Sequence, residues 1–172
     1  MVYYNEKIKT PIGSMLATAE GDSLTGLWFI GQKYFPKIQK DWTLDYDYTL
    51  FLILQKWIDS YFEYKNPPIN FNVSPKGTKF QGEVWKLLSA IPHGKTTTYG
   101  KIAKEISDNN GIRTSPRAVG HAVGHNPISL VIPCHRVIGF DGKLVNYAGG
   151  IEKKEILLKV EGGISILSQI PL

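Results

Sequence analysis

Cys134 is the only cysteine of the 172-residue chain, and it lies between a proline and a histidine in the stretch SLVIPCHRVIGFDG. A lone cysteine is most often a small buried apolar residue. Its neighbours favour another interpretation. Pro133 fixes the backbone where the apolar run predicts that a strand ends, and strand ends are where α/β proteins present functional groups. His135 follows directly, and a free thiol needs a nearby base because only a few per cent of it is thiolate at neutral pH.

A histidine that takes the thiol proton, directly or through a water molecule, needs a carboxylate to orient it and to stabilise its positive charge. Glu155 and Glu161 on the last predicted helix are both candidates, and the sequence does not choose between them. Tyr99, at the start of a short predicted helix, is a further candidate for proton transfer. Its position alone favours a half-buried tyrosine of the core.

A metal site is the weaker interpretation of the histidines. His121 and His125 are four residues apart, which puts two ligands on one face of a helix. No glutamate follows His121, and one cysteine cannot complete a zinc ligand set. We therefore expect no metal, and we expect the two histidines to face solvent or phosphate.

The elements that must position these residues follow from the apolar pattern. Residues 2–10 and 14–30 are rich in aromatic and β-branched residues, which predicts strands, two of them joined at Gly21-Asp22. Apolar residues at helical spacing predict a helix over 50–63, and the prolines of KNPPIN end it. We place a domain boundary after this segment, which gives an N-terminal sheet–helix domain at 1–77 and a C-terminal domain at 78–172.

The C-terminal domain is predicted to be mainly helical. Two short helices, the second containing several glycines, resemble a helix-turn-helix. Their connecting loop is longer than the usual turn of three or four residues, which indicates a winged or variant form. The remaining predictions are a buried strand at 128–132, a tight turn at 139–143 and a glycine loop at 146–150. Capping signals mark the starts of the predicted helices: a capping box at Thr78 and Gln81, and Ser115 followed by Pro116 in the first helical position. Two further helices are predicted to begin at Tyr99 and at Ile151, and Gly162 is available to cap the end of the last one.

The charge distribution restricts the partners. The net charge is +5, with nine Lys and Arg against eight Asp and Glu in residues 1–79, and eleven against seven in residues 80–172. A basic C-terminal half suits a polyanion such as nucleic acid, although ordinary solubility charge explains it as well. No apolar run approaches the ~20 residues that span a bilayer. With no signal-peptide pattern and no cysteine pair, the sequence predicts a cytoplasmic or nuclear protein.

Several motifs taken together identify a family. They are TTTYGKIA at 96–103, RAVG at 117–120, NP at 126–127, IPCHRVI at 132–138, NYAGG at 146–150 and KEILLKVEG at 154–162. In this order and spacing they resemble the O6-alkylguanine-DNA alkyltransferases, or methylated-DNA–protein-cysteine methyltransferases. The resemblance is strong over residues 78–162 and weaker before them. It implies an α/β N-terminal domain, a small antiparallel sheet plus helix that is ribonuclease-H-like, followed by a mainly α, winged-helix-like C-terminal domain.

The resemblance also implies the roles of the reacting residues. Cys134 would be the thiolate that accepts the alkyl group. His135 would deprotonate it through a bound water, with Glu161 behind the histidine. Tyr99 would donate a proton to the guanine, and Asn126 would brace the turn beside the cysteine.

The same resemblance implies how DNA is held. Arg117 would enter the duplex in place of the extruded nucleotide, which is flipped out at a cost of a few kcal/mol. The implied DNA-binding residues around it are Ser115, Ala118, Gly120, His121 and Gly124. The implied lining of the base pocket is Pro133, Val137, Tyr147, Ala148 and Val123.

The implied activity is direct reversal of DNA damage. An alkyl or methyl group moves irreversibly from O6 of guanine, or O4 of thymine, to the protein's own cysteine, so each molecule acts once and needs no cofactor. The implied partner is double-stranded alkylated DNA, bound through its minor groove. We expect no membrane association, no obligate protein partner and a monomer. The expected location is the cytoplasm, at the nucleoid in a bacterium or archaeon, or the nucleus in a eukaryote.

Some positions depart from the family pattern, and other functions remain to be weighed. His121 stands where a small residue is common, Ser129 where a proline often walls the pocket, and Ala148 where some relatives have serine, and the loop at 107–115 is longer. These differences bear on pocket size and substrate range. The alternatives are a lesion sensor without transfer, which would lack the cysteine, a winged-helix regulator with an incidental thiol, and a cysteine hydrolase, which would turn over.

Overall fold

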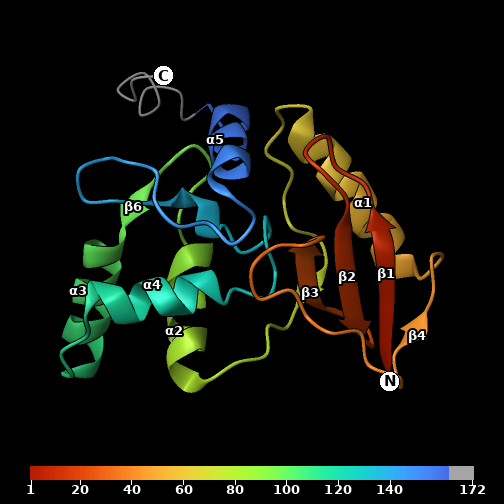
Figure 1. Ribbon diagram of the computed structural model, residues 1–172, viewed down its shortest axis with the longest axis horizontal. Helices are drawn as coiled ribbons and strands as arrows, with labels where there is room; N and C mark the ends of the chain where they lie inside the picture. Colours follow the sequence, from red (N-terminus) through yellow and green to blue (C-terminus); the bar gives the residue numbers. More distant parts are fainter. Residues whose placement is uncertain (163–172) are drawn as a thin grey trace. The chain divides into compact units, whose positions relative to one another are not determined.

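The structure is a computed structural model that describes residues 1–162; residues 163–172 of the predicted C-terminal domain lie outside the described part. The chain forms two compact units (Figure 1). The first consists of Met1–Lys76 together with Pro127–Val131. The second consists of Gly77–Asn126 and the described residues from Ile132 on.

The N-terminal unit is a sheet with one long helix. The three long strands β1 (Val2–Ile8), β2 (Met15–Glu20) and β3 (Ser23–Phe29) are antiparallel, as the sequence predicts, and β2 turns into β3 at Gly21. Two short edge strands pair parallel and make the sheet mixed, in the order β4-β1-β2-β3-β5. The helix α1 (Thr49–Phe62) packs against β1 (Figure 1). The edge strands are β4 (Thr43–Leu44) and β5 (Asn72–Val73).

The strand predicted at 128–132 does not form. Ile128 makes a single bridge to Leu27, whose backbone N–H and C=O bond to Pro127 and Ser129. Leu130 then adopts a positive φ of 70°, which ends any extended run. The segment is buried as predicted, but a short apolar run does not distinguish a strand from a buried turn.

The C-terminal unit holds the remaining helices, and their ends follow the predicted caps. Thr78 and Gln81 form both hydrogen bonds of the capping box. The Ser115 hydroxyl accepts from the Ala118 N–H, with Pro116 in the first position. Gly162, with φ +74°, follows the last helix. The helices are α2 (Lys79–Ser89), α3 (Tyr99–Asn110), α4 (Pro116–Gly124) and α5 (Ile151–Val160).

Two further features organise this unit. The indole N–H of Trp85 donates to the carbonyl of Ala122 at 2.9 Å and so ties α2 to α4. A two-strand parallel pair, β6 (Thr97–Thr98) and β7 (Val137–Ile138), brings the start of α3 beside the segment that follows the cysteine. None of the helices within residues 1–162 combines the length and apolar character that crossing a membrane requires.

Candidate active site

Cys134 opens a short 3-10 helix, η1 (Cys134–Arg136), that follows directly on Pro133. The cysteine is 5% exposed, and its backbone N–H donates to Ile132 O at 2.8 Å. Burial raises the pKa of the Cys134 thiol, against the lowering effects of a hydrogen bond from Asn126 and of the charge of Lys154. A thiol in this setting is largely protonated at neutral pH, so its reaction as a thiolate requires a base.

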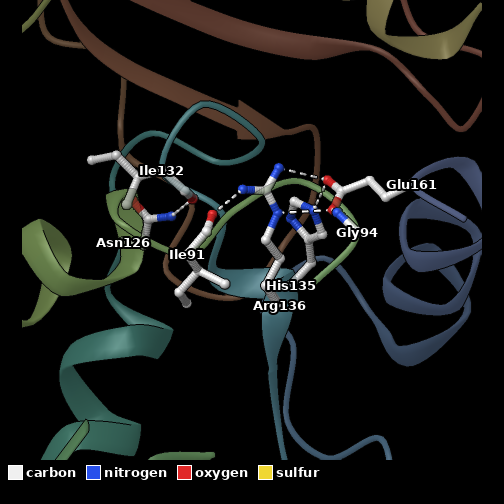
Figure 2. A network of polar contacts seen from close by, with 7 residues as sticks. All are labelled: Ile91, Gly94, Asn126, Ile132, His135, Arg136 and Glu161. Atoms are coloured by element: carbon white, nitrogen blue, oxygen red, sulfur yellow. Dashed lines mark hydrogen bonds and ion pairs between the residues drawn. The ribbon is translucent and has the colours of Figure 1, made fainter. Parts of the chain in front are cut away.

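Glu161 connects this short helix to the end of α5. Its carboxylate lies between the ring of His135 and the guanidinium of Arg136 (Figure 2). His135 Nε2 is 2.7 Å from Glu161 Oε1, and Arg136 donates through Nε at 2.8 Å and Nη2 at 2.9 Å. Gly94 N–H donates to the same carboxylate at 3.2 Å, and a Cβ at Gly94, which has φ +72°, would clash with the Glu161 carbonyl.

The alternative carboxylate, Glu155, lies elsewhere. It forms an exposed i,i+4 ion pair with Lys159 at 2.7 Å. The structure therefore brings Glu161, and not Glu155, to the histidine. The sequence left this choice open because both residues lie on or next to the same helix.

The protonation states follow from these contacts. Burial lowers the pKa of His135, so the ring is neutral at pH 7. Burial alone would raise the pKa of Glu161, but hydrogen bonds and charges from His135 and Arg136 outweigh it and hold that pKa well below its usual range. A carboxylate only accepts hydrogen bonds, so we assign the ring proton to Nε2. Nδ1 is then the basic nitrogen of His135.

Asn126 fixes the turn that leads into the cysteine. It lies just after α4, is 3% exposed, and donates from Nδ2 to Ile132 O at 2.7 Å (Figure 2). Since the Cys134 N–H bonds to the same carbonyl, Asn126 and the cysteine backbone share one anchor. Rotation of this turn would break both bonds together.

Tyr99 lies between the helix α4 and the loop that precedes α5. Its ring is the nearest group to Gly120, where an added Cβ would come within 3.7 Å of it. Its hydroxyl donates to Val145 O at 3.3 Å and Asn146 O at 3.4 Å. Burial, with a smaller contribution from Cys134, raises the pKa of Tyr99 to about 12. The phenol therefore keeps its proton at neutral pH.

Lys154 is a site residue that the sequence analysis missed. Its side chain is fully buried, and Nζ donates to Val137 O at 2.5 Å and Val145 O at 2.8 Å. Burial lowers its pKa to about 8, and the charge interaction with Cys134 opposes this. Its helical spacing in the sequence could have indicated its burial, because Lys154 shares the buried stripe of α5 with Leu157 and Leu158 at i+3 and i+4.

We expect the buried ammonium of Lys154 to cost stability at pH 7 and this cost to fall as the pH rises. Because folding lowers its pKa from 10.5 to about 8, the unfolded chain holds the proton more tightly, and stability rises with pH between these values. The variant Lys154→Met and its parent are compared by urea unfolding, both in a Cys134→Ser background. The free energy of unfolding of Lys154→Met minus that of the parent should be about 2 kcal/mol smaller at pH 10 than at pH 7. An unchanged difference would mean that the amine does not titrate in this range.

The predicted DNA-binding residues share the outer side of α4. Arg117, Ala118 and His121 are exposed, and Gly124 is half-buried. The His121 and His125 rings lie 4.2 Å apart between centroids. Within residues 1–162, no group of three or more His, Cys, Asp and Glu side chains is placed to hold a metal ion. A hollow of about 470 Å³ beside the start of the helix is lined by Phe80, Arg113, Thr114, Ser115 and Ala118.

The predicted pocket residues lie in three places. Pro133 and Val137 are buried beside the cysteine, and the Val137 carbonyl accepts from Lys154. Tyr147 and Ala148 are half-buried in the loop before α5. Val123 is 5% exposed and lies on the buried stripe of α4 with Val119 and Ala122.

Known proteins resemble this chain over nearly its whole length. Residues 79–163 match the family model of the 6-O-methylguanine DNA methyltransferase, DNA binding domain. The methylated-DNA–protein-cysteine methyltransferase of Methanosarcina mazei is 41% identical over 158 residues, which are 92% of this chain and 96% of that protein. The Mycobacterium tuberculosis enzyme is 40% identical over 161 residues, which are 94% of this chain and 93% of that protein.

Solved structures agree. A variant of the M. tuberculosis O6-methylguanine methyltransferase superposes with a TM-score of 0.81 at 40% identity, covering 100% of this chain and 96% of that one. The M. tuberculosis protein in complex with DNA gives 0.79 at 35% identity, covering 96% and 98%. Sequence and fold therefore agree over both units, and the chain belongs to the methylated-DNA–protein-cysteine methyltransferases, which repair O6-methylguanine in DNA.

Proposed function

We propose that Cys134 is the residue through which this repair methyltransferase acts, as the acceptor of the methyl group from O6 of guanine. The observation that supports it most directly is the arrangement around the only thiol of the chain. Cys134 is followed by a buried neutral histidine whose Nε2 is 2.7 Å from an ionised glutamate. This is the sequence of nucleophile, base and orienting carboxylate that activates a weak nucleophile.

The thiol proton passes through a bound water to Nδ1 of His135, and Glu161 stabilises the imidazolium. The thiolate attacks the methyl carbon, the S–C bond forms, the C–O6 bond breaks, and its electron pair stays with the guanine. Tyr99, whose phenol is protonated at neutral pH, donates its proton to the departing base; the phenolate then regains a proton from water, and the imidazolium returns its proton to water. The loop that holds Tyr147 and Ala148, with Val137, would line the base pocket.

The product is a thioether, which offers water or another thiol no easy exit. We therefore infer that each molecule acts once, as a reagent, and that no methyl-donor cofactor takes part because the lesion itself is the donor. Thymine carrying an O4-alkyl group presents the same bond to the thiolate and is a second proposed substrate. We expect a monomer in the cytoplasm, at the nucleoid, or in the nucleus if the source is eukaryotic.

Access to the methyl group requires that the nucleotide leave the stack. The outer side of α4, with Arg117 in its first turn, is the surface that we propose enters the minor groove, where little sequence is read. Such docking suits a protein that must find damage in any sequence. It is supported by the +4 charge of residues 80–172 and by the relative crystallised in complex with DNA.

The acceptor role is tested by Cys134→Ala. A thiol and a methyl group are similar in size, so the variant should fold and bind duplex DNA, yet restore no guanine in a duplex with one O6-methylguanine. Ser14→Ala, which removes an exposed hydroxyl from the N-terminal unit, serves as a control and should repair normally. Repair by Cys134→Ala would refute the proposal.

We expect Arg117→Ala to separate DNA opening from chemistry. If Arg117 fills the space left by the extruded nucleotide, its loss should slow repair of duplex DNA by about 10- to 100-fold, since unstacking costs a few kcal/mol. The reaction with free O6-benzylguanine, which needs no flipping, should keep its rate. An equal loss on both substrates would contradict the insertion role.

A further inference from the structure

A hollow beside the first turn of α4 takes no part in the chemistry at Cys134. Its volume is about 470 Å³, and its walls come from the start of α2, the loop after α3 and the first turn of α4. Ligand sites in proteins have volumes of about 300 to 1,000 Å³. The residues that line the hollow are Phe80, Arg113, Thr114, Ser115 and Ala118. The family resemblance implies no role for Phe80, Arg113 or Thr114, so the ligand must be inferred from the chemistry of the hollow itself.

The loop that forms one wall of the hollow is held in place by hydrogen bonds. The Thr114 N–H donates to Ser107 Oγ at 2.8 Å, and the Ser107 hydroxyl donates to Ala103 O at 2.8 Å. Asn110, at the end of α3, donates from Nδ2 to Glu83 Oε2 on α2 at 2.8 Å. The hollow is therefore formed before a ligand binds, and a preformed site loses less entropy on binding.

The hollow carries a positive charge that no carboxylate neutralises. Among residues 1–162, Arg113 forms no ion pair, whereas three lysines of the same unit each pair with a carboxylate. The Ser115 hydroxyl accepts from the Ala118 N–H and keeps its own proton to donate. Guanidinium and hydroxyl groups are donors to phosphate oxygens. Because Phe80 and Ala118 add apolar walls, the lining suits a ligand with both an anionic and an apolar part.

Helix geometry places the hollow beside the residue that is proposed to enter the duplex. Successive residues of an α-helix are about 100° apart around its axis. Ala118 is therefore about a third of a turn from Arg117, and Val119, the next residue round, is buried. When Arg117 points into the minor groove, the hollow beside Ala118 faces one side of that groove. The groove is about 6 Å wide and a helix with its side chains about 10–12 Å, so this flank of the helix meets the sugar–phosphate backbone.

We propose that the hollow binds one sugar–phosphate unit of the DNA backbone at the edge of the minor groove. The Arg113 guanidinium and the Ser115 hydroxyl hold the phosphate, and the deoxyribose packs on Phe80 and Ala118. The proposal rests on the proposed function, because it requires that the first turn of α4 enter the groove. A contact of this kind fixes where the helix lies on the duplex and carries no sequence information.

The test measures binding to an undamaged duplex by fluorescence anisotropy over a series of salt concentrations. Each phosphate contact contributes about 0.9 to the steepness of log affinity against log salt concentration. Arg113→Ala should reduce this steepness by about 0.9 and weaken binding at low salt about fivefold. Arg113→Lys keeps the charge and should keep the steepness. Lys56→Ala, which removes an exposed cation from α1, is the control for net charge and should bind like the wild type.

A second variant tests the hollow itself. Ala118→Met leaves the charge unchanged and fills the hollow with an apolar side chain that helices accept readily. If the phosphate lies in the hollow, Ala118→Met should lose the same steepness as Arg113→Ala, and the double variant should lose no more than either alone. Additive losses, or weaker binding by Ala118→Met at unchanged steepness, would mean that the two residues contact DNA separately and would overturn the proposal.

The remaining outcomes distinguish this proposal from the proposed function. Unchanged steepness in Arg113→Ala, or an equal loss in Lys56→Ala, would overturn the phosphate contact even if the wild type repairs a duplex with one O6-methylguanine. A wild-type protein that binds this duplex and transfers no methyl group would refute the acceptor role of Cys134, and the salt dependence would still decide the role of the hollow. A wild-type protein that binds no duplex would refute both.

Discussion

Glu161→Gln should slow alkyl transfer by about 10²- to 10⁴-fold and should also destabilise the protein. The carboxylate accepts hydrogen bonds from His135, Arg136 and the Gly94 backbone at once. Glutamine has nearly the same shape, but it carries no charge and turns an NH₂ group toward one of these donors. It would leave the partly buried guanidinium of Arg136 without its carboxylate and the imidazole without a fixed tautomer.

The stability loss from Glu161→Gln should be about 3–5 kcal/mol, the range found when one partner of a buried ion pair is removed. Glu155→Gln is the matched control, because it makes the same chemical change on the same part of the chain. Its pair with Lys159 has side chains that are 36% and 51% exposed, and pairs of this kind contribute no more than about 1 kcal/mol. Urea unfolding and the rate with free O6-benzylguanine measure both effects. Equal behaviour of the two variants would contradict the assignment of Glu161.

His135→Gln should change the pH dependence of alkylation as well as its rate. Burial lowers the pKa of His135 below its ordinary 6.5, so the wild-type base stays neutral and able to accept a proton at and below pH 6.5. The wild-type rate should therefore remain on its plateau there. Without the histidine, the rate must follow ionisation of the thiol itself, whose pKa burial raises.

For His135→Gln we accordingly expect a rate that is about 10²- to 10⁴-fold lower at pH 7 and that climbs about tenfold per pH unit into the alkaline range. Stopped-flow measurement with free O6-benzylguanine excludes effects on DNA binding. His125→Gln, which alters a half-buried histidine at the end of α4, is the control and should keep the wild-type profile. A His135→Gln profile that is lowered but unshifted would mean that the histidine positions the cysteine without acting as its base.

The sequence predicted the long elements of this fold because their signals are local. Thr78 and Ser115 are caps whose hydrogen bonds close within three residues, and both lie where they were predicted. The strands β4 to β7 have two residues each and form only through their partners, so no local pattern reveals them. The apolar run at 128–132 was predicted to be a strand, and this was wrong because its conformation also depends on residues distant in sequence. Its shape is set by the bonds to Leu27, a hundred residues away in sequence.

The site was predictable in part. Cys134 and His135 are adjacent in the sequence, so both could be chosen as candidates without the structure. The choice of Glu161 over Glu155 depends on how α5 approaches Arg136 and Gly94, which is a property of the packing. Lys154 was not predicted, because a lysine is almost never fully buried. Its burial is explained by the carbonyl oxygens that accept from its ammonium and by its position on the buried stripe of α5.

The most direct test of the account is the intact mass of the protein after incubation with excess duplex DNA that carries one O6-methylguanine. We expect a gain equal to one methylene group, mapped by peptide sequencing to Cys134, that stops at one per protein molecule while lesion remains. Tight binding to the lesion with no change in mass, or a gain on another residue, would contradict the account. So would repair that continues after the first equivalent.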